Sequence, residues 1–86
     1  MAGALPAVTG RQLIRLLRRD GWTSARRSTH GRFLSKTFPD GTVRTTVVPD
    51  KRRPLAPGTL GDILGPLQTG LGRDGLLALI QQHGLK

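Results

Sequence analysis

The sequence of 86 residues contains no cysteine, no glutamate and no tyrosine, and its aromatic residues are one tryptophan and two phenylalanines. The lack of cysteine excludes disulfides, thiolate zinc sites and cysteine nucleophiles. The five scattered aspartates and two histidines form neither a paired-carboxylate site nor a credible metal cluster, so no cofactor is expected. No long apolar run and no signal-peptide pattern is present, and a cytoplasmic, membrane-free location fits best.

The charge of the chain is strongly positive and unevenly distributed. The formal net charge is +9; residues 1–53 hold twelve of the fourteen Lys and Arg residues against three Asp, whereas residues 54–86 are neutral. A positive field on one part of a small domain is typical of proteins that bind a polyanion, most simply nucleic acid. The alternative is a solubilising surface, although solubility does not require charge to be segregated.

Hydropathy and turn signals predict the element order αβββαα. Thr9 as N-cap and Gly21 as stop signal bound a first helix, residues 10–19, with an apolar face and an opposite arginine face. Shorter segments rich in β-branched and aromatic residues follow, and two more helices come after them. The predicted strands are Trp22–Arg27, His30–Phe38 and Thr42–Val48, and the later helices span residues 57–64 and 73–82.

The predicted fold class is α+β, with helices on one face of a three-stranded antiparallel sheet whose last two strands are joined by a turn at residues 39–41. Residues 1–8 are small and unpatterned and are predicted to be a flexible tail, while residues 9–86 form a single domain. So small a domain needs its large apolar side chains for burial, so the core is expected to include all its aromatic residues: Trp22, Phe33 and Phe38.

The candidate catalytic residue is His30. Around it lie two hydroxyl groups and four cations: Ser28, Thr29, Arg26, Arg27, Arg32 and Lys36. RNA cleavage needs a base for the 2′-OH proton, an acid for the leaving 5′-oxygen and positive charge for the phosphorane. Imidazole titrates near neutral pH, and Arg and Lys neutralise phosphate. In an alternating strand His30, Arg32 and Lys36 share one face. A surface histidine on a basic strand is the alternative.

Other charged groups leave alternatives open. The arginine face of the first helix could bind phosphates or could be the solvated face of an amphipathic helix. The run Lys51–Arg53 could contact RNA or an acidic partner. His83 lies at a predicted helix end, where the helix dipole favours it, and is interpreted as structural.

Four segments carry a resemblance to a known family. They are Thr9–Trp22, a helix followed by glycine and an aromatic residue; residues 28–30, Ser-Thr-His; the turn at 39–41; and residues 47–64, with Val-Val-Pro and then Leu-Ala-Pro-Gly-Thr-Leu. Together they resemble the HicA toxins, also called YcfA-like mRNA interferases, whose motif at the second segment is glycine-serine-histidine. The resemblance covers most of the chain from Thr9 to Ile80.

The resemblance implies a double-stranded-RNA-binding-like fold, αβββα with a short additional C-terminal helix. It also implies an endoribonuclease toxin that cleaves mRNA through His30 as the single catalytic histidine and that is neutralised in a complex with a HicB-type antitoxin. The acid–base chemistry described above needs no metal, so the cleavage is expected to be metal-independent. The candidate ligands of RNA phosphate follow from the charge and position of the residues around His30. They are Arg26, Arg27, Arg32 and Lys36, with Thr29 as an orienting hydroxyl.

Two other functions are compatible with the same residues. One is a non-catalytic RNA-binding module, or an inactive toxin-like domain that binds a partner protein; the other is a basic domain that docks to an acidic protein without touching nucleic acid. A generic duplex-binding domain would place a lysine cluster at the start of its last helix, whereas residues 56–64 carry no cation. This absence argues against generic duplex binding.

Overall fold

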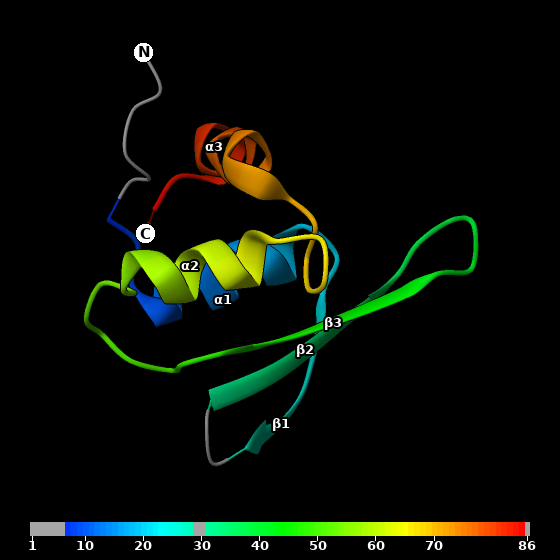
Figure 1. The fold of residues 1–86 in the computed structure, drawn as a ribbon, viewed down its shortest axis with the longest axis horizontal. Coiled ribbons are helices and arrows are strands. Elements are labelled where there is room, and N and C mark those ends of the chain that lie inside the picture. The colour runs from blue at the N-terminus through cyan, green and yellow to red at the C-terminus, as the bar shows by residue number, and fades with distance from the viewer. Residues whose placement is uncertain (1–6, 29–30, 86) are drawn as a thin grey trace.

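The computed structural model describes residues 7–28 and 31–85, with the backbone alone for residues 26–28, and has the predicted element order (Figure 1). The elements are α1 (Gly10–Arg19), β1 (Thr23–Ser28), β2 (Gly31–Thr37), β3 (Val43–Val48), α2 (Pro57–Leu64) and α3 (Gly72–His83). Each boundary lies at or within one residue of its predicted position, and the α+β class is confirmed. Among the described residues, no helix is long and apolar enough to cross a membrane.

The three strands form an antiparallel sheet in the order β1-β2-β3. The pairing of β2 with β3 is continuous, with Arg32 opposite Val48, whereas the pairing of β1 with β2 is irregular between Ser24 and Arg27. The helices α1, α2 and α3 lie on the same side of the sheet (Figure 1). One face of the sheet therefore contributes to the core, and this is the layered arrangement predicted from the sequence.

The sequence of α1 specifies both its start and its buried face. The Thr9 hydroxyl accepts a hydrogen bond from the Gln12 backbone N–H (3.0 Å), and the Gln12 side-chain oxygen accepts one from the Thr9 N–H (2.9 Å). Such a capping box satisfies two free backbone donors, and an N-cap of this type stabilises a helix by about 1 kcal/mol. The buried side chains of α1 lie on one face: Leu13, Ile14, Leu16 and Leu17. The arginines are therefore left on the outside.

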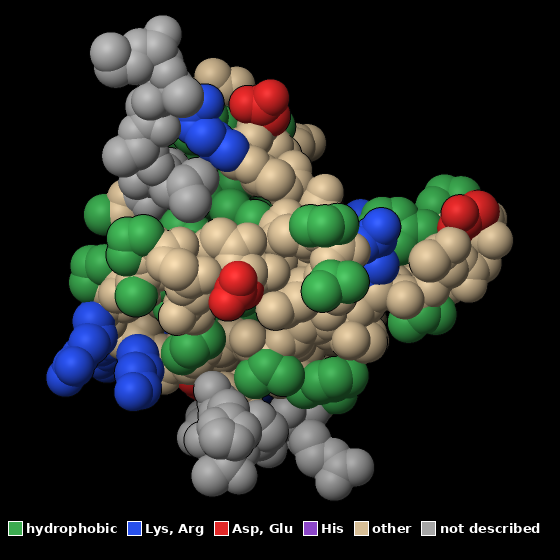
Figure 2. Space-filling model, viewed as in Figure 1, with side chains coloured by type: hydrophobic (Ala, Val, Ile, Leu, Met, Phe, Trp, Pro, Cys, Tyr) green, Lys and Arg blue, Asp and Glu red, His purple; other side chains and the backbone are tan. Residues whose placement is uncertain are grey.

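The sequence of α2 forms a weak helix that is held by packing. Its N-cap, Ala56, makes no side-chain cap, although Pro57 suits the first turn, and two glycines lie in the helix. Leu60, Ile63 and Leu64 are buried beneath it. In the view of Figure 2 the surface over α2 is mainly neutral and apolar, and the Lys and Arg side chains lie at the edge of this face.

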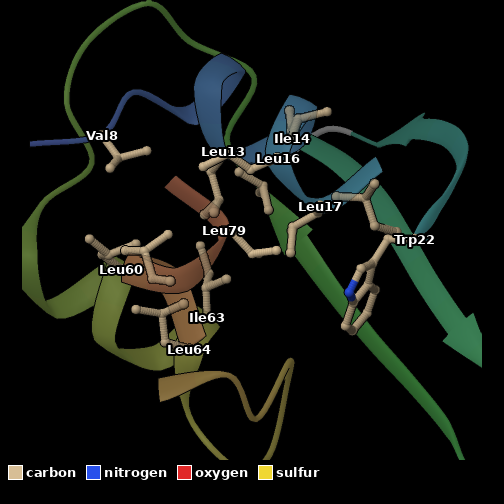
Figure 3. Close-up of a cluster of buried hydrophobic side chains, with 13 residues drawn as sticks. Val8, Leu13, Ile14, Leu16, Leu17, Trp22, Leu60, Ile63, Leu64 and Leu79 are labelled. Carbon is tan, nitrogen blue, oxygen red and sulfur yellow. The ribbon is translucent and has the colours of Figure 1, made fainter. Parts of the chain in front are cut away.

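The core lies between the helices and the covered face of the sheet (Figure 3). Trp22, which follows α1, is 3% exposed and meets the ring of Phe38 edge-on, with the ring centroids 6.4 Å apart. From the sheet come Leu34 and Val48, both fully buried, and from α3 come Leu76 and Leu79. The predicted core position of Trp22 is confirmed, and Phe38 is partly buried and packs against the core.

The prediction that Phe33 belongs to the hydrophobic core was wrong. Successive strand residues point to opposite faces, and Leu34, the next residue, is fully buried on the face that the helices cover. Phe33 pairs with Val47, which is 37% exposed, and is itself only half-buried. It therefore lies on the sheet face away from the helices, because the strand register takes precedence over the general tendency of aromatic residues to be buried.

Val8 is part of the core, although the sequence placed it in the flexible tail. Its side chain is fully buried, and its carbonyl accepts a hydrogen bond from the Leu55 N–H (2.8 Å). The next residue, Thr9, forms an isolated β-bridge with Pro54. An isolated valine shows no periodicity from which burial could be predicted, and here the segment before α2 supplies its contacts. The ordered domain therefore includes Val8.

Candidate functional site

The start of α1, the start of β2 and the end of β3 meet at one end of the sheet. A Cβ atom on Gly10 would overlap the backbone carbonyl of Pro49, and a Cβ on Gly31 would overlap that of Val48. Gly31 also has a φ of 144°, a value that side chains rarely allow. The Arg11 N–H donates to the Lys51 carbonyl (3.1 Å) and ties α1 to the loop after β3. Glycine at both positions therefore permits backbone contact between these three segments.

Asp50 connects two arginines at this junction. Its Oδ1 lies 3.3 Å from Arg11 Nε, and its Oδ2 lies 3.6 Å from Arg32 Nη2. Arg32 also donates from Nη1 to the Ser24 hydroxyl (3.4 Å), whereas its Nε is buried and has no hydrogen-bond partner among the described residues. Both ion pairs are partly exposed, and such pairs contribute at most about 1 kcal/mol each. Asp50 therefore orients Arg11 and Arg32 more than it stabilises the fold.

Beside these ion pairs lies a cavity of about 550 Å³, here named the arginine cavity. Its lining residues come from α1, β2 and the loop after β3: Arg11, Ile14, Arg15, Arg18, Arg19, Arg32 and Asp50. The lining thus combines five guanidinium groups with one carboxylate. Such an excess of cations in a concave surface attracts an anionic ligand, and guanidinium groups bind phosphate oxygens in bidentate geometry.

The predicted catalytic residue, His30, lies outside the described residues, as does Thr29. The described residues on either side, Ser28 and Gly31, pair with each other in the sheet. The residue after Gly31 is Arg32, which lines the arginine cavity. Among the predicted phosphate ligands, Arg26 and Arg27 belong to β1, and the backbone of Arg27 pairs with that of Arg32.

Lys36 shares a strand face with Arg32, as predicted, but lies in a different environment. Its Nζ donates to the backbone carbonyl of Asp20 (2.7 Å) and to the Asp20 carboxylate (3.3 Å), and it lies 5.1 Å from the centre of the Phe38 ring. It lines a second cavity, of about 680 Å³, at the other end of the strand. The structure therefore separates the two predicted phosphate ligands of β2.

In the second cavity, the pKa of the Asp40 carboxyl group is lowered. Its carboxylate accepts a hydrogen bond from the Thr42 N–H (2.9 Å), and this bond lowers the pKa of Asp40 below its ordinary value of 3.8. The interaction closes the turn between β2 and β3 and does not involve the arginine cavity. Among the described residues, no group of three His, Cys, Asp or Glu side chains is placed to hold a metal ion.

The sequence-based site set did not include the arginines of α1 or Asp50. The spacing of the arginines did indicate that they lie together, because residues 11, 15, 18 and 19 recur on one side of a helix. That spacing left open whether the row binds phosphate or is simply solvated. Nothing in the sequence placed Asp50 next to Arg11, because the contact joins residues 39 positions apart.

Comparison with known proteins bears on the identity of the chain. Neither a search of curated proteins nor a search of solved structures gave a significant match. The model of one family, described as the HicA toxin of bacterial toxin–antitoxin systems, matches residues 10–71. This match runs from the first residue of α1 to the residue before α3, so it includes the sheet and every residue that lines the arginine cavity. The chain therefore belongs to the HicA toxin family.

Proposed function

We propose that this toxin is an endoribonuclease that cleaves mRNA by acid–base catalysis, without a metal, through His30. The observation that carries the proposal is the arginine cavity, which extends to Arg32, two residues after His30 in the sequence. An RNA phosphate held by these guanidinium groups would lie near the segment that carries the histidine. The membership of the chain in a toxin family supports the same conclusion.

The proposed chemistry is an attack of the ribose 2′-oxygen on the adjacent phosphorus with departure of the 5′-oxygen. The P–O2′ bond forms as the P–O5′ bond breaks, which leaves a 2′,3′-cyclic phosphate and a 5′-hydroxyl. His30 removes the 2′-OH proton or protonates the leaving oxygen, since imidazole can do either near neutral pH, and solvent exchanges the other proton. Arg32 and its neighbours stabilise the negative charge of the phosphorane. In this mechanism Arg26 and Arg27 are further phosphate ligands, and Thr29 orients the phosphate through its hydroxyl. Lys36 is left out because it does not line the arginine cavity and its ammonium group is bonded to Asp20.

The antitoxin partner of this toxin is proposed to be of the HicB type and to form a hetero-oligomeric complex with it. Cleavage of mRNA takes place in the cytoplasm in this proposal. A partner that blocks the RNA-binding surface would neutralise the toxin, and the exposed arginines of α1 offer such a partner complementary charge.

The proposed activity is tested by inducible expression of the wild type and of His30→Ala, with growth and total mRNA integrity followed over time. We expect the wild type to arrest growth and fragment mRNA, and His30→Ala to do neither. His83→Ala is the matched control, because His83 ends α3 and is not among the residues that line the arginine cavity. Cleavage of a defined RNA by the purified wild type in excess EDTA tests the independence from metal.

Three outcomes would contradict the proposal. Equal toxicity of the wild type and His30→Ala would exclude His30 as the catalytic group. Loss of toxicity in His83→Ala but not in His30→Ala would identify His83 as the catalytic histidine. Absence of cleavage by a wild-type protein that still binds RNA would leave a non-catalytic RNA-binding module.

A further inference from the structure

The charge in the arginine cavity is only partly balanced. Asp50 pairs with Arg11 and Arg32, and Arg19 donates to the backbone carbonyl of His83 (3.1 Å). Among the described residues, Arg15 and Arg18 have neither an ion pair nor a hydrogen bond through their side chains, and both are exposed. These two guanidinium groups can therefore bind an anionic ligand without first breaking an ion pair or a hydrogen bond.

The arginines form a row along α1. Residues 11, 15 and 19 follow at intervals of four, so their backbone positions rise by about 6 Å each along the axis. Arg32 lies across from this row on β2, and Ile14, which is 9% exposed, supplies an apolar part of the lining. A row of this length accommodates more than one phosphate, which favours a chain of phosphates over a single anion.

The remaining surface does not favour an RNA duplex. A domain that binds duplex RNA through shape contacts two successive minor grooves and the phosphates between them, and so needs cations at separate places. Here α2 carries no Lys or Arg, and the face over it is mainly neutral (Figure 2). Five of the fourteen Lys and Arg residues instead line one open, concave site, and a flexible single strand can follow such a site more readily than a rigid duplex.

We propose that the arginine cavity binds the backbone of single-stranded RNA, with Arg15 and Arg18 as its principal phosphate ligands. The identity of the ligand as RNA, and not another polyanion, rests on the proposed function. The cavity holds nucleotides that flank the cleaved bond, so it contributes to substrate binding, and the acid–base groups act separately from it. The specificity for single strands follows from the shape of the site and from the absence of cations on α2.

The test uses His30→Ala protein, so that binding is measured without cleavage. A fluorescent single-stranded RNA and the duplex of the same sequence are titrated at several salt concentrations. Arg15→Gln and the pair Arg15→Gln with Arg18→Gln are compared with Arg73→Gln, an exposed helical arginine outside the cavity. Circular dichroism and thermal unfolding confirm that each variant is folded, as expected for exposed side chains.

We expect tighter binding of the single strand than of the duplex. The slope of log K against log salt should fall by about 0.7 in the single variant and about 1.4 in the double variant, because each lost phosphate contact on a single strand removes about that much. The affinity of the double variant should fall on the order of tenfold at low salt. Arg73→Gln should leave the slope unchanged.

Three results would overturn the proposal. Equal slopes in the double variant and Arg73→Gln would show that the cavity does not hold the RNA backbone, whether or not the wild type cleaves RNA. Duplex binding as tight as that of the single strand would remove the specificity for single strands. If the arginine changes weakened binding of a polyglutamate peptide but not of RNA, the occupant would be an acidic protein segment. Loss of RNA binding by the double variant, with no cleavage by the wild type, would support the cavity assignment while excluding the proposed nuclease.

Discussion

The two cavities at opposite ends of β2 both contain cations, but they differ in how these cations are neutralised. In the second cavity Lys36 is bonded to Asp20, and Arg44 donates from Nη1 to the carbonyls of Pro66 (2.7 Å) and Gln68 (3.3 Å). In the arginine cavity Asp50 pairs with Arg11 and Arg32, whereas Arg15 and Arg18 have no side-chain acceptor among the described residues. The same charge thus holds the fold together at one end and is available to a ligand at the other.

This difference shows that a count of Lys and Arg does not locate a binding site. Arg32 and Lys36 lie four residues apart on one face of β2 and are equivalent by sequence pattern. Both are ion-paired, Arg32 with Asp50 and Lys36 with Asp20. What distinguishes them is their surroundings: Arg32 lies beside the arginines of α1, whereas the Lys36 ammonium has two acceptors on Asp20, which it must lose before it binds phosphate. The predictions below test this distinction, beginning with the largest expected effect.

The largest effect is expected from Gly10→Ala, which would disrupt the junction beside the arginine cavity. The added Cβ would overlap the Pro49 carbonyl, so α1 or the loop that carries Asp50 must shift. We expect a loss of about 3 kcal/mol in the free energy of unfolding, measured by urea denaturation. Gly58→Ala, in the first turn of α2, is the control: nothing lies near its Cβ, and it should stabilise by about 0.5 kcal/mol. Equal changes in the free energy of unfolding for Gly10→Ala and Gly58→Ala would contradict the close contact between Gly10 and the Pro49 carbonyl.

A smaller loss of stability is expected from Lys36→Met. The change removes the hydrogen bonds from Nζ to Asp20 at the end of α1 and should lower the free energy of unfolding by roughly 1 kcal/mol. The salt dependence of RNA binding, measured in the His30→Ala background, should not change. Arg15→Gln should show the reverse pattern, with normal stability and a reduced salt slope. A reduced slope in Lys36→Met would return Lys36 to the set of phosphate ligands.

Asp50→Asn tests whether the single carboxylate of the arginine cavity limits its attraction for RNA. Loss of two partly exposed ion pairs should lower the free energy of unfolding by about 0.5 kcal/mol. RNA binding to the His30→Ala protein should become a few-fold tighter, because the cavity gains positive charge. Asp62→Asn makes the same change of charge at an exposed position of α2. An equal gain in RNA affinity in both variants would mean that the net charge of the protein, and not the charge of the arginine cavity, determines the affinity.

The smallest effect is expected from Asp40→Asn and appears as a change in pH dependence. The hydrogen bond from the Thr42 N–H lowers the pKa of Asp40 in the folded protein below 3.8. A carboxyl group with a lowered pKa in the folded state stabilises at pH values above its unfolded pKa, and this stabilisation is lost as the pH falls through the folded pKa. Thermal unfolding should therefore show a small advantage of the wild type at pH 6 that diminishes at acidic pH, as the pH falls below 3.8 and through the folded-state pKa of Asp40. A constant difference at both pH values would exclude titration of Asp40 as its cause.

Local signals in the sequence were sufficient to predict the fold. The Thr9 and Gln12 capping box, the apolar face of α1 and the alternation in β2 are interactions between near neighbours, which the order of residues specifies directly. The prediction failed where burial depends on distant segments. Val8 is buried against the segment before α2, and Phe33 is excluded from the core by the register of the sheet.

The site was predictable only in part, for the same reason. The sequence determined that the charge lies in the first half of the chain, that α1 carries a row of arginines and that His30 lies in a basic segment. Tertiary structure alone decided that Arg11 and Arg32 meet at Asp50 while Lys36 is bonded to Asp20. A strand rises about 3.3 Å per residue, so two cations on one face can reach different partners. Residue order specifies which face a cation occupies, whereas the packing of distant segments determines whether that cation remains free to bind a ligand.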